Sequence, residues 1–150
     1  MGTIGDEIKQ KKFKSVHHKM LINLVYTTNW LNTIQMREFK IYGLSVQQYK
    51  ILRILRGQGE KAVNLGLIQE RMLDKNSNAS RLIEKLRLKK LIDRQEAKED
   101  RRQVDISITP KGLELLAKID IALEDSEKKY HTLSEQEADE LSNLLDKLRG

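Results

Sequence analysis

The sequence predicts a mainly helical protein with one small β-hairpin, and three observations support this fold class. Charged residues make up 33% of the 150 residues and aromatic residues 5%, with a single proline, which is typical of long solvated helices. Apolar residues recur at helical spacing along most of the chain. Residues 104–108 instead alternate apolar and polar side chains, as a half-buried strand does. At this length the chain is most simply one domain, 1–150.

The composition excludes several classes of protein. The chain has no cysteine, so disulfide frameworks, thiolate zinc sites and cysteine redox switches are ruled out. No apolar run approaches the roughly 20 residues that span a bilayer, and the N-terminal residues lack the apolar segment of a signal peptide. We therefore expect a cytoplasmic protein without a membrane partner.

Basic residues gather in the middle of the chain. The formal net charge is +6, but residues 75–103 hold ten Lys and Arg against five Asp and Glu, whereas residues 113–150 hold ten acidic against five basic residues. A localised basic region is typical of proteins that bind polyanions, because each cation near a phosphate releases condensed counterions. A lysine-rich run on its own more often marks a solvated helix face.

The first half of the chain predicts helices. Residues 4–39 show helical apolar spacing with no Gly or Pro after Gly5, which predicts one long helix and leaves a break near its start open. A second helix is expected up to Gly57, started by a capping box of Ser45 and Gln48. Its apolar residues must be covered by a neighbouring helix.

A helix-turn-helix follows. Residues 64–73 predict a short helix capped by Asn64, residues 74–76 a polar break, and residues 77–90 a longer helix. The apolar stripe of the longer helix is Ala79, Leu82, Ile83 and Leu86. The side chains left outside that stripe are Asn78, Ser80, Arg81, Glu84, Lys85 and Arg87. Such a face can read bases in a DNA major groove, although taken alone it also fits an ordinary amphipathic helix.

A β-hairpin is expected directly after this second helix. Residues 91–98 and 104–108 predict its strands, and the charged residues 99–102 its tip. A hairpin behind a helix-turn-helix defines a winged helix. The tip would carry Arg101 and Arg102 toward the adjacent minor groove, whose negative potential attracts arginine.

The hairpin, together with the start of the preceding helix, resembles the MarR family (multiple-antibiotic-resistance regulators) of dimeric bacterial transcription factors. The matching residues are Asp100, Arg102, Val104, Ile106, Ile108, Thr109 and Gly112. Residues 77–82 stand where the family has the Ser/Thr-rich start of its recognition helix, with Asn78 and Ala79 in place of the common Thr and a β-branched residue. The resemblance covers about residues 10–148.

The resemblance implies a winged helix-turn-helix part, 44–112, with recognition helix 77–90 in the major groove and wing 97–104 in the minor groove. In the family the wing Arg enters the minor groove and an Asp orients it, which implies these roles for Arg102 and Asp100 and places Arg101 on phosphate. The residues expected to contact DNA are Lys75, Asn76, Ser77, Asn78, Ser80, Arg81, Lys85, Asp100, Arg101 and Arg102.

The last third of the chain predicts two more helices. Thr109 can cap the first, with Pro110 at its first position, and the helix continues toward Lys129; Ser134 begins the second with another capping box. The second helix has a leucine stripe made of Leu141, Leu144, Leu145 and Leu148. By itself the stripe fits either an intramolecular core or a partner helix.

In the MarR family the first and last helices of two subunits interlock. This implies a homodimer whose helical dimerisation part is 4–40 and 113–150. Such a dimer would present two recognition helices roughly 34–36 Å apart to a pseudo-palindromic operator in double-stranded DNA.

Ligand sites are less clearly marked. Relatives in the family often have a small-molecule pocket between the two parts, which Met20, Tyr26, Trp30 and Tyr49 would line and which implies a small aromatic effector. The commoner role of aromatic residues at helical spacing is core, and we favour it. His17, His18 and His131 lack metal-ligand spacing, so we expect neither a metal nor a cofactor.

The sequence and its resemblance to the MarR family predict a sequence-specific DNA-binding transcriptional regulator. We expect a homodimeric repressor whose repression is relieved by a small ligand. A catalytic site is not expected, because the chain has no phosphate-cradling glycine loop and no nucleophile motif. The alternative is a helical protein-interaction module on a winged-helix scaffold that no longer binds DNA.

Overall fold

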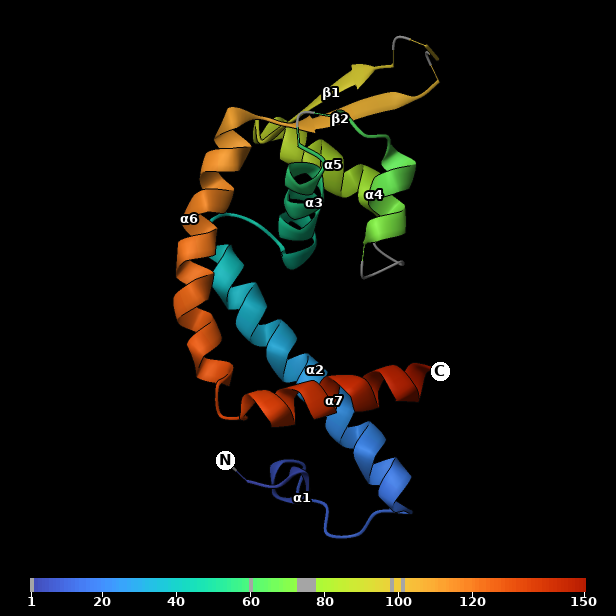
Figure 1. Cartoon of the computed structure of the whole chain (residues 1–150), viewed down its shortest axis with the longest axis vertical. Coiled ribbons are helices and arrows are strands. Elements are labelled where there is room, and N and C mark those ends of the chain that lie inside the picture. The colour runs from blue at the N-terminus through green and yellow to red at the C-terminus, as the bar shows by residue number, and fades with distance from the viewer. Residues whose placement is uncertain (1, 60, 73–77, 98, 101) are drawn as a thin grey trace.

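A computed structural model of the chain describes residues 2–59, 61–72, 78–97, 99–100 and 102–150. Helices α3, α4 and α5 and the hairpin form a lobe at one end, while α2 and α6 run away from it toward α7 at the other (Figure 1). The elements are α1 (Ile4–Glu7), α2 (Val16–Lys40), α3 (Val46–Gly57), α4 (Leu65–Arg71), α5 (Ala79–Leu88), β1 (Ile92–Glu96), β2 (Val104–Ile108), α6 (Pro110–Glu127), the 3₁₀ helix η1 (Lys128–Tyr130) and α7 (Glu135–Arg149). This mainly helical fold with a two-stranded hairpin confirms the predicted fold class.

The N-terminal segment forms two helices where the sequence predicts one. Helix α1 ends at Glu7, and α2 begins at Val16 after Ser15, whose hydroxyl accepts the amide of His18. The hydroxyl of Tyr26 donates to the Glu7 carboxylate at 2.8 Å, and this bond ties α1 back to α2. The amides of Lys9 and Gln10 donate to the carbonyls of Asp6 and Gly5, and Lys9 has φ +55°, so α1 ends in a Schellman motif without a glycine and α2 starts anew at the Ser15 cap.

The hydrophobic core lies in the lobe and takes in one end of each long helix. Ile51, Leu52 and Leu55 of α3 are fully buried, and Leu116 and Ile119 of α6 pack into the same cluster. Ser45 and Gln48 form the predicted capping box, which aims this apolar face of α3 inward. The core holds the lobe together without any contribution from α7, which has no buried side chain.

The hairpin extends from the side of the lobe. Strands β1 and β2 pair antiparallel, with Ile92 opposite Ile108 and Arg94 opposite Ile106. Ile106 is buried, and its backbone exchanges hydrogen bonds of 2.8 and 2.9 Å with Val63, so a third chain segment joins the sheet at that point. The sequence predicts the hairpin but not this bridge. The hairpin is therefore attached to the rest of the lobe through backbone as well as side chains.

The turn between α5 and β1 has a left-handed residue. Lys90 has φ +61°, and its amide and that of Leu91 donate to the carbonyls of Arg87 and Leu86. These two bonds form a Schellman motif, which ends a helix in a residue that is usually glycine. The Thr109 hydroxyl donates to the Lys90 carbonyl at 2.8 Å, which holds the turn against the start of α6.

A glycine is required where α6 passes this turn. A Cβ atom on Gly112 would lie 2.4 Å from the carbonyl oxygen of Leu91. The Thr109 hydroxyl also accepts the Gly112 amide at 3.1 Å, as the predicted N-cap does, and Pro110 occupies the first helical position. The Thr-x-x-Gly motif therefore joins the end of α5 to the long helix α6.

Two helix ends differ from the predicted bounds. Helix α4 stops at Arg71, with Met72 extended after it, and the predicted end at Leu73 lies outside the described residues. Helix α6 stops at Glu127, and η1 completes the segment that was predicted to continue to Lys129. Through the part of the chain that the structure describes, no helix is long and apolar enough to cross a membrane.

Candidate nucleic-acid interface

Helix α5 has one buried face and one exposed face. Ala79, Ile83 and Leu86 are buried in the lobe core, which confirms most of the predicted apolar stripe, while Leu82 is half-buried. The side chains on the opposite face are exposed, and they include Ser80, Arg81 and Lys85. Because the buried face fixes the helix in the lobe, the polar and basic face is presented outward as a rigid surface.

The start of α5 differs from the prediction. The helix begins at Ala79, and Asn78 is its N-cap, with Oδ1 accepting the amide of Arg81 at 3.2 Å. Asn78 therefore lies just before the helix rather than inside it, because its side-chain carbonyl satisfies a free backbone amide, and its contact with DNA stays a prediction. The predicted contact residues Lys75, Asn76 and Ser77 lie outside the described residues.

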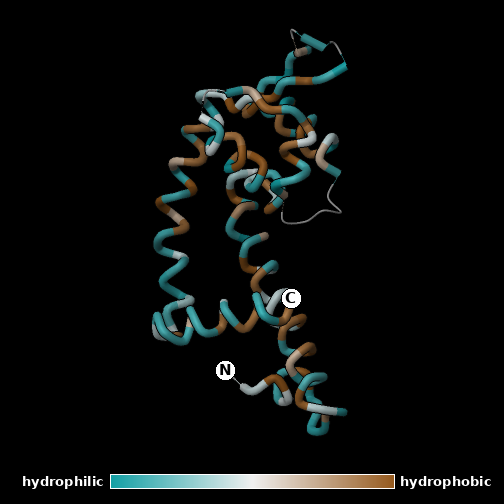
Figure 2. The backbone as a smooth tube through the Cα atoms, turned by 45° about the vertical axis from the view of Figure 1, so that its right-hand side comes forward, coloured by the Kyte–Doolittle hydropathy of each residue, from teal (hydrophilic) through white to brown (hydrophobic). Residues whose placement is uncertain are grey.

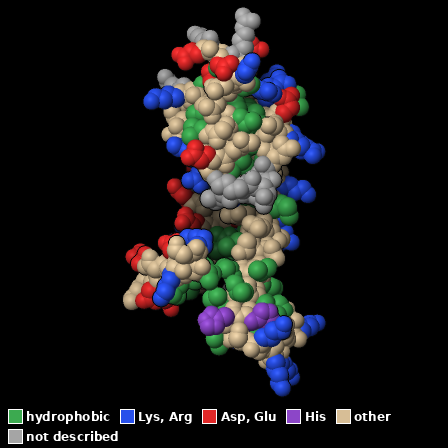
Figure 3. All heavy atoms as spheres, turned by 90° about the vertical axis from the view of Figure 1, so that its right-hand side faces the viewer, with side chains coloured by type: hydrophobic (Ala, Val, Ile, Leu, Met, Phe, Trp, Pro, Cys, Tyr) green, Lys and Arg blue, Asp and Glu red, His purple; other side chains and the backbone are tan. Residues whose placement is uncertain are grey.

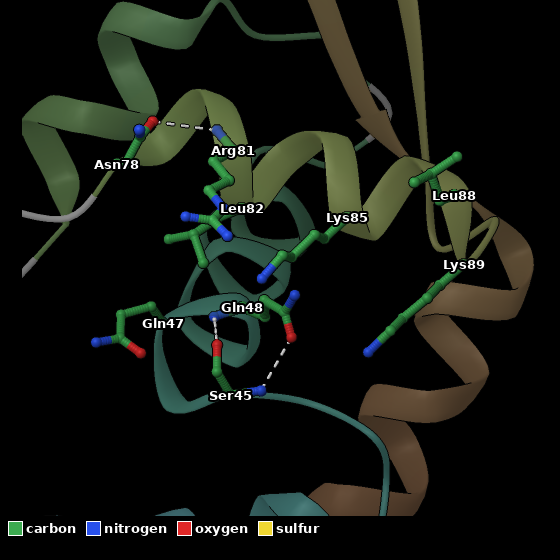
Figure 4. Close-up of a pocket in the computed structure, with 9 residues that line it drawn as sticks. All are labelled: Ser45, Gln47, Gln48, Asn78, Arg81, Leu82, Lys85, Leu88 and Lys89. Carbon is green, nitrogen blue, oxygen red and sulfur yellow. Dashed lines mark hydrogen bonds between the residues drawn. The ribbon is translucent and has the colours of Figure 1, made fainter.

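A basic groove runs between α5 and the N-terminal end of α3. Figure 4 shows the side chains of Arg81, Lys85 and Lys89, which follow one another at four-residue spacing, above Ser45 and Gln47 of α3. The hollow has a volume of about 760 Å³. Lys89 was not among the residues expected to contact DNA, although its four-residue spacing from Lys85 places it on the same helix face as Arg81 and Lys85.

One acidic residue interrupts the basic surface of α5. The Glu84 carboxylate accepts hydrogen bonds of 2.6 and 3.0 Å from Arg87 and lies 3.7 Å from the guanidinium of Arg94 on β1. The hydrogen bond from Arg87 lowers the pKa of Glu84, and the same bond raises the pKa of Arg87. Glu84 therefore takes up part of the positive charge of this helix, and Arg87 is engaged within the protein.

The hairpin tip is shaped by a turn at Asp100. Its carboxylate accepts the backbone amide of Arg102 at 3.0 Å, and its carbonyl accepts the amide of Gln103 at 3.0 Å. The family resemblance implies that Asp100 orients the wing arginine; the bond seen here is to the Arg102 backbone, so Asp100 shapes the turn from which the exposed guanidinium projects. Arg101 lies outside the described residues.

A second hollow connects the hairpin to α5. Its volume is about 350 Å³, and Ser80 of α5, Arg94 of β1 and Arg102 all line it. The structure thus brings together two predicted contact residues, Ser80 and Arg102, from segments more than twenty positions apart. Arg94 was not among the predicted contact residues, and nothing in the sequence of its strand indicates that it lines this hollow.

The four residues expected to line a ligand pocket lie in different surroundings. Tyr49 is buried, and its ring stacks on Phe39 with centroids 4.3 Å apart. Trp30 lies in α2, where its ring meets Tyr130 edge to face at 6.0 Å, while Met20 and Tyr26 are partly exposed. The packing of Tyr49 fits the core role that we favour, and a ligand pocket at these residues stays a prediction.

Metal-ligand clusters are likewise not found: within the described ranges, no three His, Asp or Glu side chains gather closely enough to hold an ion.

The combination of a helix-turn-helix, a hairpin wing and a basic helix face defines a winged helix-turn-helix protein. Residues 42–103 match the sequence model of the MarR family. A MarR transcription factor from Planctomyces limnophilus superposes with a TM-score of 0.70 at 28% identity, covering 90% of this chain and 98% of that one. Over its winged helix-turn-helix part the chain is therefore similar to the MarR family of winged-helix transcriptional regulators.

Two further solved structures share the fold. The organohalide-sensing regulator RdhR-CbdbA1625, in a form bound to 2,4-dichlorophenol, has a TM-score of 0.80 at 19% identity, covering 93% of this chain and 85% of that one. BpsR of Bordetella bronchiseptica, whose DNA binding is regulated by 6-hydroxynicotinic acid, has a TM-score of 0.67 at 22% identity and covers 85% and 99%. No curated protein sequence matches the chain. The family and its structural neighbours are transcription regulators rather than enzymes.

Proposed function

We propose that this protein is a homodimeric, sequence-specific regulator that binds double-stranded DNA with α5 in the major groove and the hairpin in the adjacent minor groove. One observation carries the proposal: α5 buries Ala79, Ile83 and Leu86 while its outward face is polar and basic. A helix fixed in this way can enter the major groove without rearranging the lobe.

The chemistry of the exposed face fits base and phosphate recognition. Ser80 is short enough to let the backbone approach the base edges, and Arg81 can donate two parallel hydrogen bonds to a guanine. Lys85, four residues further along the same face, suits a phosphate, since its ammonium is a point charge without a preferred plane. Arg102 at the hairpin suits a narrow minor groove, where the potential is most negative.

Pairing of two chains is supported by the terminal helices. The leucine stripe on one side of α7 is exposed to solvent, and Leu144 within it is 63% exposed. Helix α2 does the same, with Val25 60% exposed. Figure 3 shows apolar side chains gathered in the angle beside these helices, and Figure 2 shows hydrophobic residues recurring along both. A second copy that contributes the same helices would cover this surface symmetrically.

Repression relieved by a small aromatic ligand is the regulatory part of the proposal. Two of the structurally similar regulators, RdhR-CbdbA1625 and BpsR, are described with a small aromatic molecule that is bound or that controls DNA binding. In this chain Trp30 and Tyr130 meet edge to face and join α2 to η1, the short helix that follows α6. A ligand that alters this contact would change the separation of the two recognition helices.

Trp30 is the only tryptophan, so its fluorescence reports on this contact. Phenols and aromatic carboxylates would be titrated against its emission, and DNA affinity would be measured again at saturation. Coupling is reciprocal, and a true effector should weaken DNA binding by a factor on the order of 5–150. If each compound that changes the emission leaves DNA affinity unchanged, ligand control at this contact is excluded.

The DNA-binding function is tested by selecting bound sequences from random duplex DNA. We expect a pseudo-palindromic site with half-sites about one helical turn apart. Arg81→Ala should relax selection at one position in each half-site, whereas the control Lys12→Ala, far from α5 in the N-terminal segment, should select the same site. Failure to enrich any sequence would leave the protein-interaction alternative.

A further inference from the structure

A second basic surface lies where α5 ends and α6 begins. We call its four members the junction lysines: Lys89, Lys90, Lys111 and Lys118. Lys89, Lys111 and Lys118 line a hollow of about 440 Å³ whose apolar lining includes Leu91 and Leu115 and whose acidic residue is Glu114. All four junction lysines are exposed. None of them was among the residues expected to contact DNA.

The junction surface continues the basic face of α5. Lys89 lines both the groove that contains Arg81 and Lys85 and the junction hollow. Lys111 is bound to the end of α5, since its ammonium donates to the Lys89 carbonyl at 3.2 Å. Basic side chains therefore extend from α5 to the first turn of α6, with Glu114 as the acidic residue of the junction hollow.

Two of the junction lysines have charges that remain available. Lys89 donates to the carbonyl of Gly43 and Lys111 to the carbonyl of Lys89, so both exposed ammonium groups already have a partner within the protein. The ammonium groups of Lys90 and Lys118 make no hydrogen bond or ion pair with any residue of the described ranges. An exposed cation without an internal partner is free to bind an external anion.

Lys90 has a further property that makes it testable. It occupies the left-handed position of the Schellman motif, where glycine carries no Cβ penalty. Its place near the C-terminal end of α5 also complements the helix dipole. Left-handed geometry alone does not single out Lys90, because Lys9 shares it with φ +55°. What distinguishes Lys90 is its position on a basic surface continuous with α5.

We propose that the junction lysines bind phosphates of the DNA duplex beyond the groove that α5 enters, with Lys90 and Lys118 making the contacts. The inference rests on the proposed DNA-binding function and extends the interface past the recognition helix and hairpin. Duplex DNA is favoured over an acidic protein because the surface is continuous with α5 and because contacts to phosphate need cations rather than shape.

The test is a fluorescence-anisotropy titration of a labelled duplex of random sequence with the full-length protein at several salt concentrations. A random duplex suffices because phosphate contacts carry no sequence information. The variants are Lys90→Gly, Lys90→Arg and Lys118→Gln. Lys9→Gly is the matched control, since it also removes one exposed charge and one left-handed side chain, at a site remote from α5.

Lys90→Gly should lower the slope of log affinity against log salt by about 0.9, the value for one lost phosphate contact, and weaken binding about threefold at low salt. Lys118→Gln should act in the same direction, whereas Lys90→Arg and Lys9→Gly should match the wild type. Both glycine variants should melt at or above the wild-type temperature, which shows that lost binding is not lost folding.

The outcomes separate this inference from the function on which it rests. If the wild type and Arg81→Ala both fail to bind duplex DNA, the proposed function itself is contradicted. If the wild type binds and Lys90→Gly and Lys118→Gln keep its affinity and salt slope, the junction surface is not a DNA contact. Equal weakening by Lys9→Gly would also overturn it, because the effect would then reflect net charge alone.

Discussion

The lobe and the terminal helices bury apolar side chains to very different extents. In the lobe, Ile51, Leu52 and Ile83 are buried to 2% exposure or less, and its charged residues lie outside. Helix α7 buries no side chain, and α2 buries only Phe39, at the end that enters the lobe. The chain thus folds a closed core next to helices whose apolar faces lack a partner.

The lobe is complete in a single chain, whereas the terminal helices need a second one. A closed core fixes the position of α5 and the hairpin relative to each other, so one chain suffices to form a reading surface. Uncovered apolar faces are costly in water, so the terminal helices are complete only when a second copy covers them. Changes to the two regions should therefore have separable effects.

Truncation before Ser134 should have the largest effect. It removes the leucine stripe of α7, so we expect loss of pairing, lower solubility and loss of binding to DNA with two half-sites. Sedimentation of the truncated and intact chains, followed by titration with one-half-site and two-half-site duplexes, checks this. A truncated chain that still pairs would show that α7 is dispensable for pairing and would contradict the role proposed for its leucine stripe.

Leu52→Ala should destabilise the lobe by about 2–5 kcal/mol, because it leaves a cavity in the closed core. The loss should appear in urea unfolding at every protein concentration. Leu144→Ala is the matched change in the open region. It should cost less than about 0.5 kcal/mol in the separated chain and act by weakening the pair, so its effect should grow on dilution. Concentration-independent losses of similar size in both variants would contradict the distinction.

Arg102→Ala should weaken specific DNA binding by about 1–3 kcal/mol without changing stability, since its side chain is exposed at the hairpin tip. The loss should be greatest on duplexes with A·T pairs at the flanks, where the minor groove is narrow. Anisotropy titrations on duplexes with altered flanks measure this, with Arg101→Ala expected to have the smaller effect. Unchanged affinity in Arg102→Ala would remove the wing from the interface.

Glu84→Gln should have the smallest effect, limited to acid stability. The hydrogen bond from Arg87 lowers the pKa of Glu84 below its ordinary value of 4.5. A carboxylate with a lowered pKa stabilises the fold above its unfolded pKa, and this contribution is lost as pH falls through the folded value. The wild type should thus lose a small increment of stability below about pH 4 that the variant lacks. Parallel acid dependence of the urea midpoints would show that the bond contributes nothing.

Local features of the fold could be predicted from sequence, and features set by distant contacts could not. Ser45, Thr109 and Ser134 begin helices as predicted, because a cap depends on the residues next to it. The bond from Tyr26 to Glu7 joins residues nineteen positions apart, and the backbone bridge from Val63 to Ile106 joins residues still farther apart. Neither contact could be predicted from neighbouring residues.

The candidate site was predicted in the same uneven way. The exposed face of α5 follows from helical periodicity, so Ser80, Arg81 and Lys85 were found. Asn78 was expected inside the helix and is instead its N-cap, one position before the first helical residue. For Tyr49 the sequence left core and pocket open, and the stacking of its ring on Phe39 depends on a residue of another helix.

Sedimentation equilibrium of the intact chain, alone and with the duplex selected from random DNA, shows whether the protein binds DNA as a pair. We expect two chains of 17.5 kDa in the free protein at micromolar concentration and two chains on each duplex. A free monomer that binds the duplex as a single chain would contradict this expectation.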